Sequence, residues 1–109
     1  MDENRTKMKA QYTTLYSEVE QILFRLDPVG INFGENTDEY ASEVDTILPR
    51  LKEASSQADV LNIVHEEFCR WFDVDTAGKK SQPVYSEVAS EIWKSWLKFS
   101  RLIHHQKTS

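Results

Sequence analysis

The sequence predicts an all-α protein, an antiparallel four-helix bundle in which residues 1–109 form a single domain. Apolar residues recur at intervals of three and four over long segments, which is the period of a helix with one buried face. Gly and Pro number only three each, too few for the many turns of a sandwich or barrel of short strands. Three Trp, four Tyr and five Phe supply the aromatic side chains of one small core.

The first helix is expected over residues 3–26, and it contains no Gly or Pro. Its apolar residues follow steps of four and three: Met8, Tyr12, Leu15, Val19, Ile22 and Leu26. Asp27-Pro28 ends the helix, because proline disfavours helical geometry in the residue before it. A long loop over residues 28–36 follows. Its apolar residues Ile31 and Phe33 are expected to tuck under the helices.

The second helix is expected to begin at Asn36 or Thr37, either of which suits a helix N-cap. Its buried stripe consists of Tyr40, Val44, Ile47, Leu48 and Leu51. Pro49 lies inside this stripe and is expected to kink the helix or to divide it in two.

The third helix is expected from Ser56, with Asp59 completing a weak capping arrangement, to about Asp73. A polar loop over residues 73–82 leads to Pro83, which suits the first turn of the last helix. That helix runs to about residue 105 and is the most apolar, so it is predicted to lie at the centre of the bundle and to hold the other helices together. Its stripe includes Val88, Ile92, Trp96 and Phe99.

His65 and Cys69 are four residues apart and share a helix face, which makes them the first candidates for metal binding. Two ligands do not complete a zinc site, and no Glu-x-x-His pair of a di-iron bundle occurs in the chain. We therefore predict no metal, no cofactor and no enzymatic activity. An enzyme that uses Cys69 with a histidine as its nucleophile is the lesser alternative.

Cys69 is the only cysteine, so an internal disulfide is excluded and a reducing compartment is favoured. The first nine residues are polar and show no signal peptide, and no apolar stretch approaches the roughly 18 residues of a membrane span. These observations predict a cytoplasmic protein that does not bind a membrane.

Charge is distributed unevenly along the chain. Residues 1–75 carry a net charge of −9 and residues 76–109 a net charge of +4. Basic residues of the last helix, such as Lys94 and Lys98, alternate with Trp93 and Trp96, a pattern that nucleic-acid binding can produce. Cations near a helix C-terminus are the better explanation, and the overall charge of −5 argues against a phosphate backbone as ligand.

The acidic part is densest between Arg25 and Arg50, where six acids occur and no base. We predict that four of them form a binding face for a basic protein, with Tyr40 or Phe33 as an apolar anchor if exposed. These four acids are Glu35, Asp38, Glu39 and Glu43. Helix capping and solubility are the alternative explanation of the same acids.

One motif in this region resembles a known pattern. Asp27-Pro28-Val29-Gly30-Ile31, followed by Asp38-Glu39-Tyr40 and Glu43-Val44, resembles small bacterial proteins of the YugE-like kind, helical bundles with no assigned activity. Similar patterns occur among small cytosolic immunity proteins of bacterial toxin systems. The resemblance covers mainly residues 15–72.

The resemblance implies a bacterial, non-enzymatic protein that neutralises a cognate toxin by binding it. A toxin domain that cuts nucleic acid has a basic active-site surface, which an acidic face would complement. The alternative is a structural or regulatory bundle that forms a homodimer. Its interface would involve Trp71, Trp93 and Trp96 if these lie on the surface.

Overall fold

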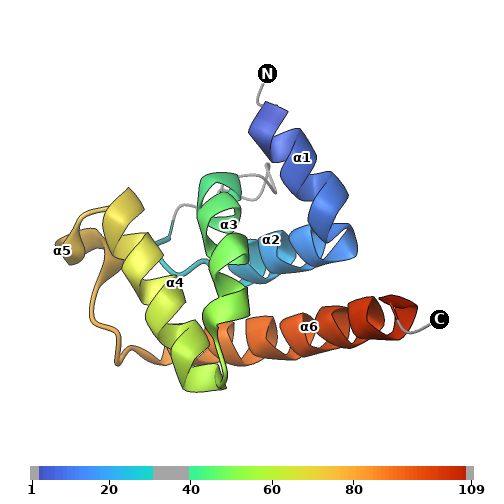
Figure 1. Ribbon diagram of the computed structural model, residues 1–109. Helices are drawn as coiled ribbons and strands as arrows, with labels where there is room; N and C mark the ends of the chain where they lie inside the picture. The colour runs from blue at the N-terminus through green and yellow to red at the C-terminus, as the bar shows by residue number, and fades with distance from the viewer. Residues whose placement is uncertain (1–2, 31–39, 108–109) are drawn as a thin grey trace.

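A computed structural model describes residues 3–30 and 40–107 of the chain. This part is helical and contains no β-strand (Figure 1). Its elements are α1 (Glu3–Tyr12), α2 (Thr14–Leu26), α3 (Ala41–Ile47), the 3₁₀ helix η1 (Leu48–Glu53), α4 (Gln57–Trp71), α5 (Val74–Ala77) and α6 (Pro83–Lys107). The predicted all-α class is confirmed. The described residues form more helices than the four predicted, because the chain breaks at Thr13 and adds a short turn at Val74–Ala77.

The prediction of one helix over residues 3–26 was wrong. Thr13 has a φ of 50° and separates α1 from α2. Positive φ is strained for a β-branched residue, so packing must hold it there. The break turns α1 toward α3 (Figure 1), where the Arg5 guanidinium lies 2.8 Å from the Asp45 carboxylate.

The predicted end of the first helical segment at Asp27-Pro28 is confirmed. α2 ends at Leu26, and Asp27 adopts the left-handed conformation with its backbone N–H on the Leu23 carbonyl oxygen, 2.8 Å away. α2 lies beside α6 and runs in the opposite direction (Figure 1). The face of α2 toward the core is fully apolar apart from one hydroxyl: Leu15, Tyr16, Val19, Ile22 and Leu23 are buried.

The predicted division at Pro49 is also confirmed. α3 ends at Ile47 and the chain continues as η1, with Pro49 in its first turn. Proline has no backbone N–H, so it cannot make the α-helical hydrogen bond that would continue α3. All members of the predicted stripe are at most 1% exposed: Tyr40, Val44, Ile47, Leu48 and Leu51. The predicted caps Asn36 and Thr37, and Ile31 and Phe33 of the preceding loop, lie outside the described residues.

α4 begins as predicted, because Ser56 Oγ accepts the Asp59 backbone N–H at 3.2 Å. The polar loop predicted over residues 73–82 is partly helical instead. Asp73 Oδ1 accepts the Thr76 backbone N–H at 2.6 Å and caps α5, which Gly78 ends at a φ of 78°. α5 buries one small side chain, Ala77, so hydrophobic periodicity does not reveal it.

α6 holds the structure together, as predicted, by packing against both α2 and α4. Its N-terminal half supplies fully buried residues, among them Tyr85, Val88 and Ile92. Trp96 and Phe99, further along, are only partly buried and pack at the edge of the core. None of the helices within the described residues is both long enough and apolar enough to cross a membrane.

Candidate functional site

The loop between α2 and α3 is closed at its base by Tyr40. The Tyr40 hydroxyl donates to Asp27 Oδ1 at 2.7 Å and accepts the Val29 backbone N–H at 3.3 Å. The ring is fully buried and stacks on Phe68, with 5.8 Å between ring centroids. We call residues 28–39 the acidic loop. The described residues that flank residues 31–39 are thereby held together at one point of the bundle.

Two of the predicted binding residues are buried. Tyr40 is 0% exposed and Glu43 is 4% exposed, so neither is available to a partner. The spacing along the helix explains why Glu43 is buried. It lies three residues after Tyr40 and four before Ile47, on the same inward face of α3. The other predicted residues, Glu35, Asp38 and Glu39, belong to the acidic loop and lie outside the described residues, as does Phe33.

Glu43 is a buried acid with an unsatisfied oxygen. Among the described residues, its Oε1 finds no hydrogen-bond partner. Burial raises the pKa of this carboxyl above its ordinary value, the Asp45 charge raises it further, and Arg5 opposes the change. The ionised form therefore destabilises the folded protein, since an unpaired charge in the interior loses its hydration.

We expect Glu43→Gln to stabilise the protein at neutral pH by about 1 kcal/mol, because the amide keeps the shape and removes the charge. The raised pKa of Glu43 means that the wild type gains stability as pH falls through this folded-state pKa. The advantage of the variant should therefore shrink on acidification and vanish below the ordinary pKa of glutamate. Urea unfolding at a series of pH values measures it. A constant difference at all pH values would contradict a buried charge as its cause.

We expect Tyr40→Phe to loosen the base of the acidic loop. The change removes the hydroxyl that bridges Asp27 and the Val29 backbone, at a cost of about 1.5–3 kcal/mol for a hydrogen bond to a charged group. Amide hydrogen exchange at Val29 should accelerate more than exchange in α6. Tyr12→Phe, a change at a half-buried tyrosine of α1, is the control. Equal acceleration in all helices would show a global effect instead.

His65 and Cys69, the candidates for metal binding and catalysis, lie close to each other on α4. His65 Nε2 lies 2.8 Å from the Gly78 carbonyl oxygen, so this nitrogen is the hydrogen-bond donor. Cys69 Sγ is 3.7 Å from His65 Nε2 and 3.9 Å from Nδ1. In the described part of the chain, no three His, Cys, Asp or Glu residues are grouped so that they could hold a metal.

His65 connects α4 to the start of α6. Its ring meets the ring of Tyr85 edge-on, with centroids 5.1 Å apart. Burial raises the pKa of Tyr85 to about 12, and its hydroxyl donates to the Ala77 carbonyl oxygen. These contacts give His65 a role in fastening α5 and the following turn to the bundle.

Glu67 is a second buried acid, which the sequence pattern did not predict. Arg50 of η1 reaches across to α4, where its Nη1 lies 2.9 Å from Glu67 Oε2 and its Nη2 lies 2.8 Å from Glu66 Oε1. Glu67 is 1% exposed, whereas Arg50 is 29% exposed. Glu67 shares the stripe of Val60, Val64 and Phe68, a position where a charged residue signals a buried ion pair.

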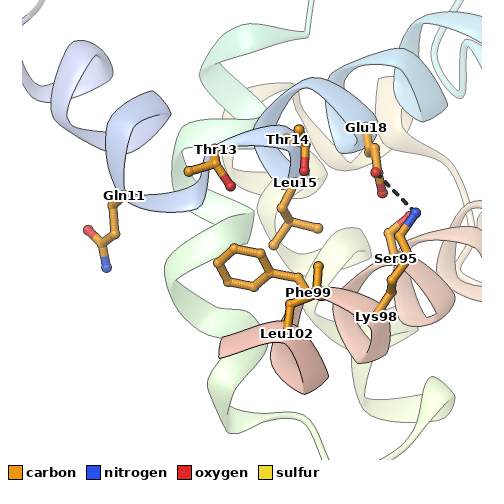
Figure 2. Close-up of a pocket in the computed structure, with 9 residues that line it drawn as sticks. All are labelled: Gln11, Thr13, Thr14, Leu15, Glu18, Ser95, Lys98, Phe99 and Leu102. Carbon is orange, nitrogen blue, oxygen red and sulfur yellow. Dashed lines mark ion pairs between the residues drawn. The ribbon is translucent and has the colours of Figure 1, made fainter. Parts of the chain in front are cut away.

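A groove opens where the break at Thr13 meets the C-terminal half of α6 (Figure 2). Its volume is about 190 Å³. The lining combines apolar side chains with hydroxyls and one ion pair: Gln11, Thr13, Thr14, Leu15, Glu18, Ser95, Lys98, Phe99 and Leu102. Lys98 Nζ lies 3.2 Å from Glu18 Oε2 at the rim. The sequence placed Lys98 and Phe99 on one helix but gave no sign that Thr13 lies beside them.

Among the described residues, large apolar side chains are exposed around the α4–α5 junction and on α6. Trp71 at the end of α4 is 46% exposed, and Val74 at the start of α5 is 69% exposed. On α6, Leu97 is 39% exposed and Leu102 is 55% exposed. The Trp71 indole N–H donates to Thr46 Oγ1 at 3.0 Å, which orients the ring over α3.

No protein-family model matches the chain, and neither a curated protein nor a solved structure is significantly similar to it.

Proposed function

We propose that this chain is a non-enzymatic binding protein that meets a basic protein partner through its acidic loop. The observation that supports this most is the clamp at the base of the loop, where Tyr40 holds Asp27 and Val29. Surface loops whose ends are fastened together often carry function, because the scaffold positions them. Within residues 28–39 every charged residue is an acid: Glu35, Asp38 and Glu39.

The charge of the first 75 residues, −9, favours the same partner. A field of one sign accelerates the encounter with a partner of the opposite sign and disfavours partners of like sign. In its specific form, the proposal is an immunity-type protein of the bacterial cytoplasm that covers the basic surface of a toxin nuclease domain. The resemblance of the Asp27–Ile31 motif to such proteins supports this form.

A pull-down from the native host tests the proposal. The bait is the full chain, compared with a variant that carries Glu35→Lys, Asp38→Lys and Glu39→Lys. One basic protein should be captured in stoichiometric amount at low salt by the wild type and should be lost with the variant. A nuclease activity in the captured protein that the wild-type chain inhibits would support the immunity form.

A matched variant separates the loop from overall charge. Glu3→Lys, Asp75→Lys and Glu87→Lys change the net charge equally at exposed positions on α1, α5 and α6. This control should keep the partner. Loss of the partner from both variants would refute recognition by the loop, and capture of no stoichiometric protein by the wild type would refute the proposal.

Self-association is the second candidate, and the exposure of Trp71 and Val74 favours it. Exposed aromatic and apolar side chains that lie together often belong to an interface. Sedimentation velocity over a range of concentrations would show a dimer that Trp71→Ser dissociates. The matched change Leu97→Ser should leave such a dimer intact, and a monomer at all concentrations would exclude this candidate.

A further inference from the structure

The second half of α6 presents an exposed face of mixed character, which we call the basic face: Lys94, Leu97, Lys98, Arg101 and Leu102. Successive steps of three and one place these residues on one side of the helix. All five are exposed. No acid follows Glu91 in the sequence, so cations surround the two leucines without an acid on the same stretch of helix.

The groove beside α6 continues this face, because Lys98 and Leu102 belong to both (Figure 2). Leu15 and Phe99 contribute its apolar lining. A cavity of roughly 150 Å³ in a protein accepts a benzene ring. The groove, at about 190 Å³, therefore has room for one aromatic or branched aliphatic side chain.

We propose that the basic face and the groove together bind an acidic amphipathic helix of a partner protein. One apolar side chain of that helix enters the groove beside Phe99, and its carboxylates pair with Lys94, Lys98 and Arg101. A helix bound in an apolar groove presents anchors at every third or fourth residue of its own sequence, and the groove beside Phe99 has room for one of them. The charge of the face selects an acidic partner.

The existing contact of Lys98 does not oppose this binding. Lys98 is 65% exposed and its partner Glu18 is 33% exposed, so their ion pair contributes little and exchanges readily.

The aromatic residues of α6 argue against nucleic acid as the occupant. Trp93 and Trp96 pack against the core, and the Phe99 ring lies 5.9 Å from that of Tyr12, so these three rings of α6 are engaged with the protein itself and offer no open platform for bases.

The test uses two capped helical peptides with the same leucine spacing. One carries glutamate on the flanking positions and the other carries lysine. Each is titrated into the full chain while tryptophan emission and backbone amide NMR shifts are recorded. Trp96 reports on the groove, since its ring lies 6.0 Å from that of Phe99. We expect only the glutamate peptide to bind, with the largest shifts at Ser95, Phe99 and Leu102, and with affinity that falls as salt rises.

Two charge variants locate the site. Lys98→Glu with Arg101→Glu should weaken binding about tenfold. Lys52→Glu with Lys79→Glu makes the same charge change at exposed positions away from the groove and should bind as the wild type does. Leu102→Asp should abolish binding, whereas Val74→Asp should not. Thermal melts confirm that each variant is folded, which is expected because all these positions are exposed.

The proposal would be overturned if both peptides bound equally or if neither bound. It would also be overturned if the two charge variants weakened binding equally, or if the NMR shifts lay away from α6. The basic face could instead bind a single-stranded oligonucleotide or anionic vesicles and not the glutamate peptide. That result would show that its occupant is nucleic acid or a membrane and not a partner helix. A dimer that Leu102→Asp dissociates would identify a second copy of the chain instead. None of these results bears on the acidic loop, since the variants that locate the site leave residues 28–39 unchanged.

Discussion

Arg50→Ala is expected to destabilise the protein by about 3 kcal/mol, because it leaves the Glu67 carboxylate buried without its closest counter-charge. Arg50 provides the Nη1 contact at 2.9 Å, and after its removal the nearest cation would be Arg70, whose Nε lies 4.0 Å from Glu67 Oε1. Arg70 is 72% exposed and is therefore well hydrated. A domain of this size has a free energy of unfolding of about 5–15 kcal/mol, so the loss would be severe. Urea unfolding measures it.

A double-mutant cycle assigns the loss to Glu67. Glu67→Gln in the Arg50→Ala background removes the buried charge and should restore about half of the lost stability. Lys52→Ala, at an exposed position of the same 3₁₀ helix, should change the free energy of unfolding by less than about 0.5 kcal/mol. A loss below about 1 kcal/mol for Arg50→Ala would show that water or Arg70 compensates Glu67 in the folded state.

The helices that hydrophobic periodicity predicts are those that bury a continuous stripe. α4 and α6 begin and end close to the predicted residues, and the interruption at Pro49 follows from the missing N–H of proline. Thr13 could not be predicted, because no glycine or proline marks the break. The Arg5 contact that the turned α1 makes is with Asp45, 40 residues away. α5 was missed for a different reason: its signal is the cap formed by Asp73 and Thr76, not a buried stripe.

The two buried acids show that residue type alone does not predict which side chains face solvent. A charged residue is normally assigned to solvent, yet Glu43 and Glu67 occupy core positions of their helices. Their spacing to neighbouring apolar residues is visible in the sequence. The pairing of Glu67 with Arg50 is not visible there, because the bend at η1 is what brings Arg50 to α4. The groove likewise depends on how α6 lies against the Thr13 break, which no local pattern encodes.

Phe68→Ala is expected to cost about 3–5 kcal/mol, because it opens a cavity where α3, α4 and α6 meet. Phe68 is 0% exposed. Its ring lies 5.8 Å from that of Tyr40, 5.9 Å from that of Tyr85 and 5.7 Å from that of Phe72, measured between centroids. Truncation therefore removes three aromatic contacts in addition to the buried area. Tyr40 and Tyr85 cannot move into the space without releasing the hydrogen bonds of their hydroxyls.

Trp71→Ala on the same helix is the matched comparison. It deletes a larger aromatic side chain, but Trp71 is 46% exposed and leaves no enclosed cavity, so its cost should be about 1 kcal/mol. Because Phe68 supports the ring of Tyr40, its truncation should also accelerate hydrogen exchange at Val29, as Tyr40→Phe does, whereas Trp71→Ala should not. Equal costs for the two truncations would mean that side-chain size, and not enclosure by three rings, determines stability at this end of α4.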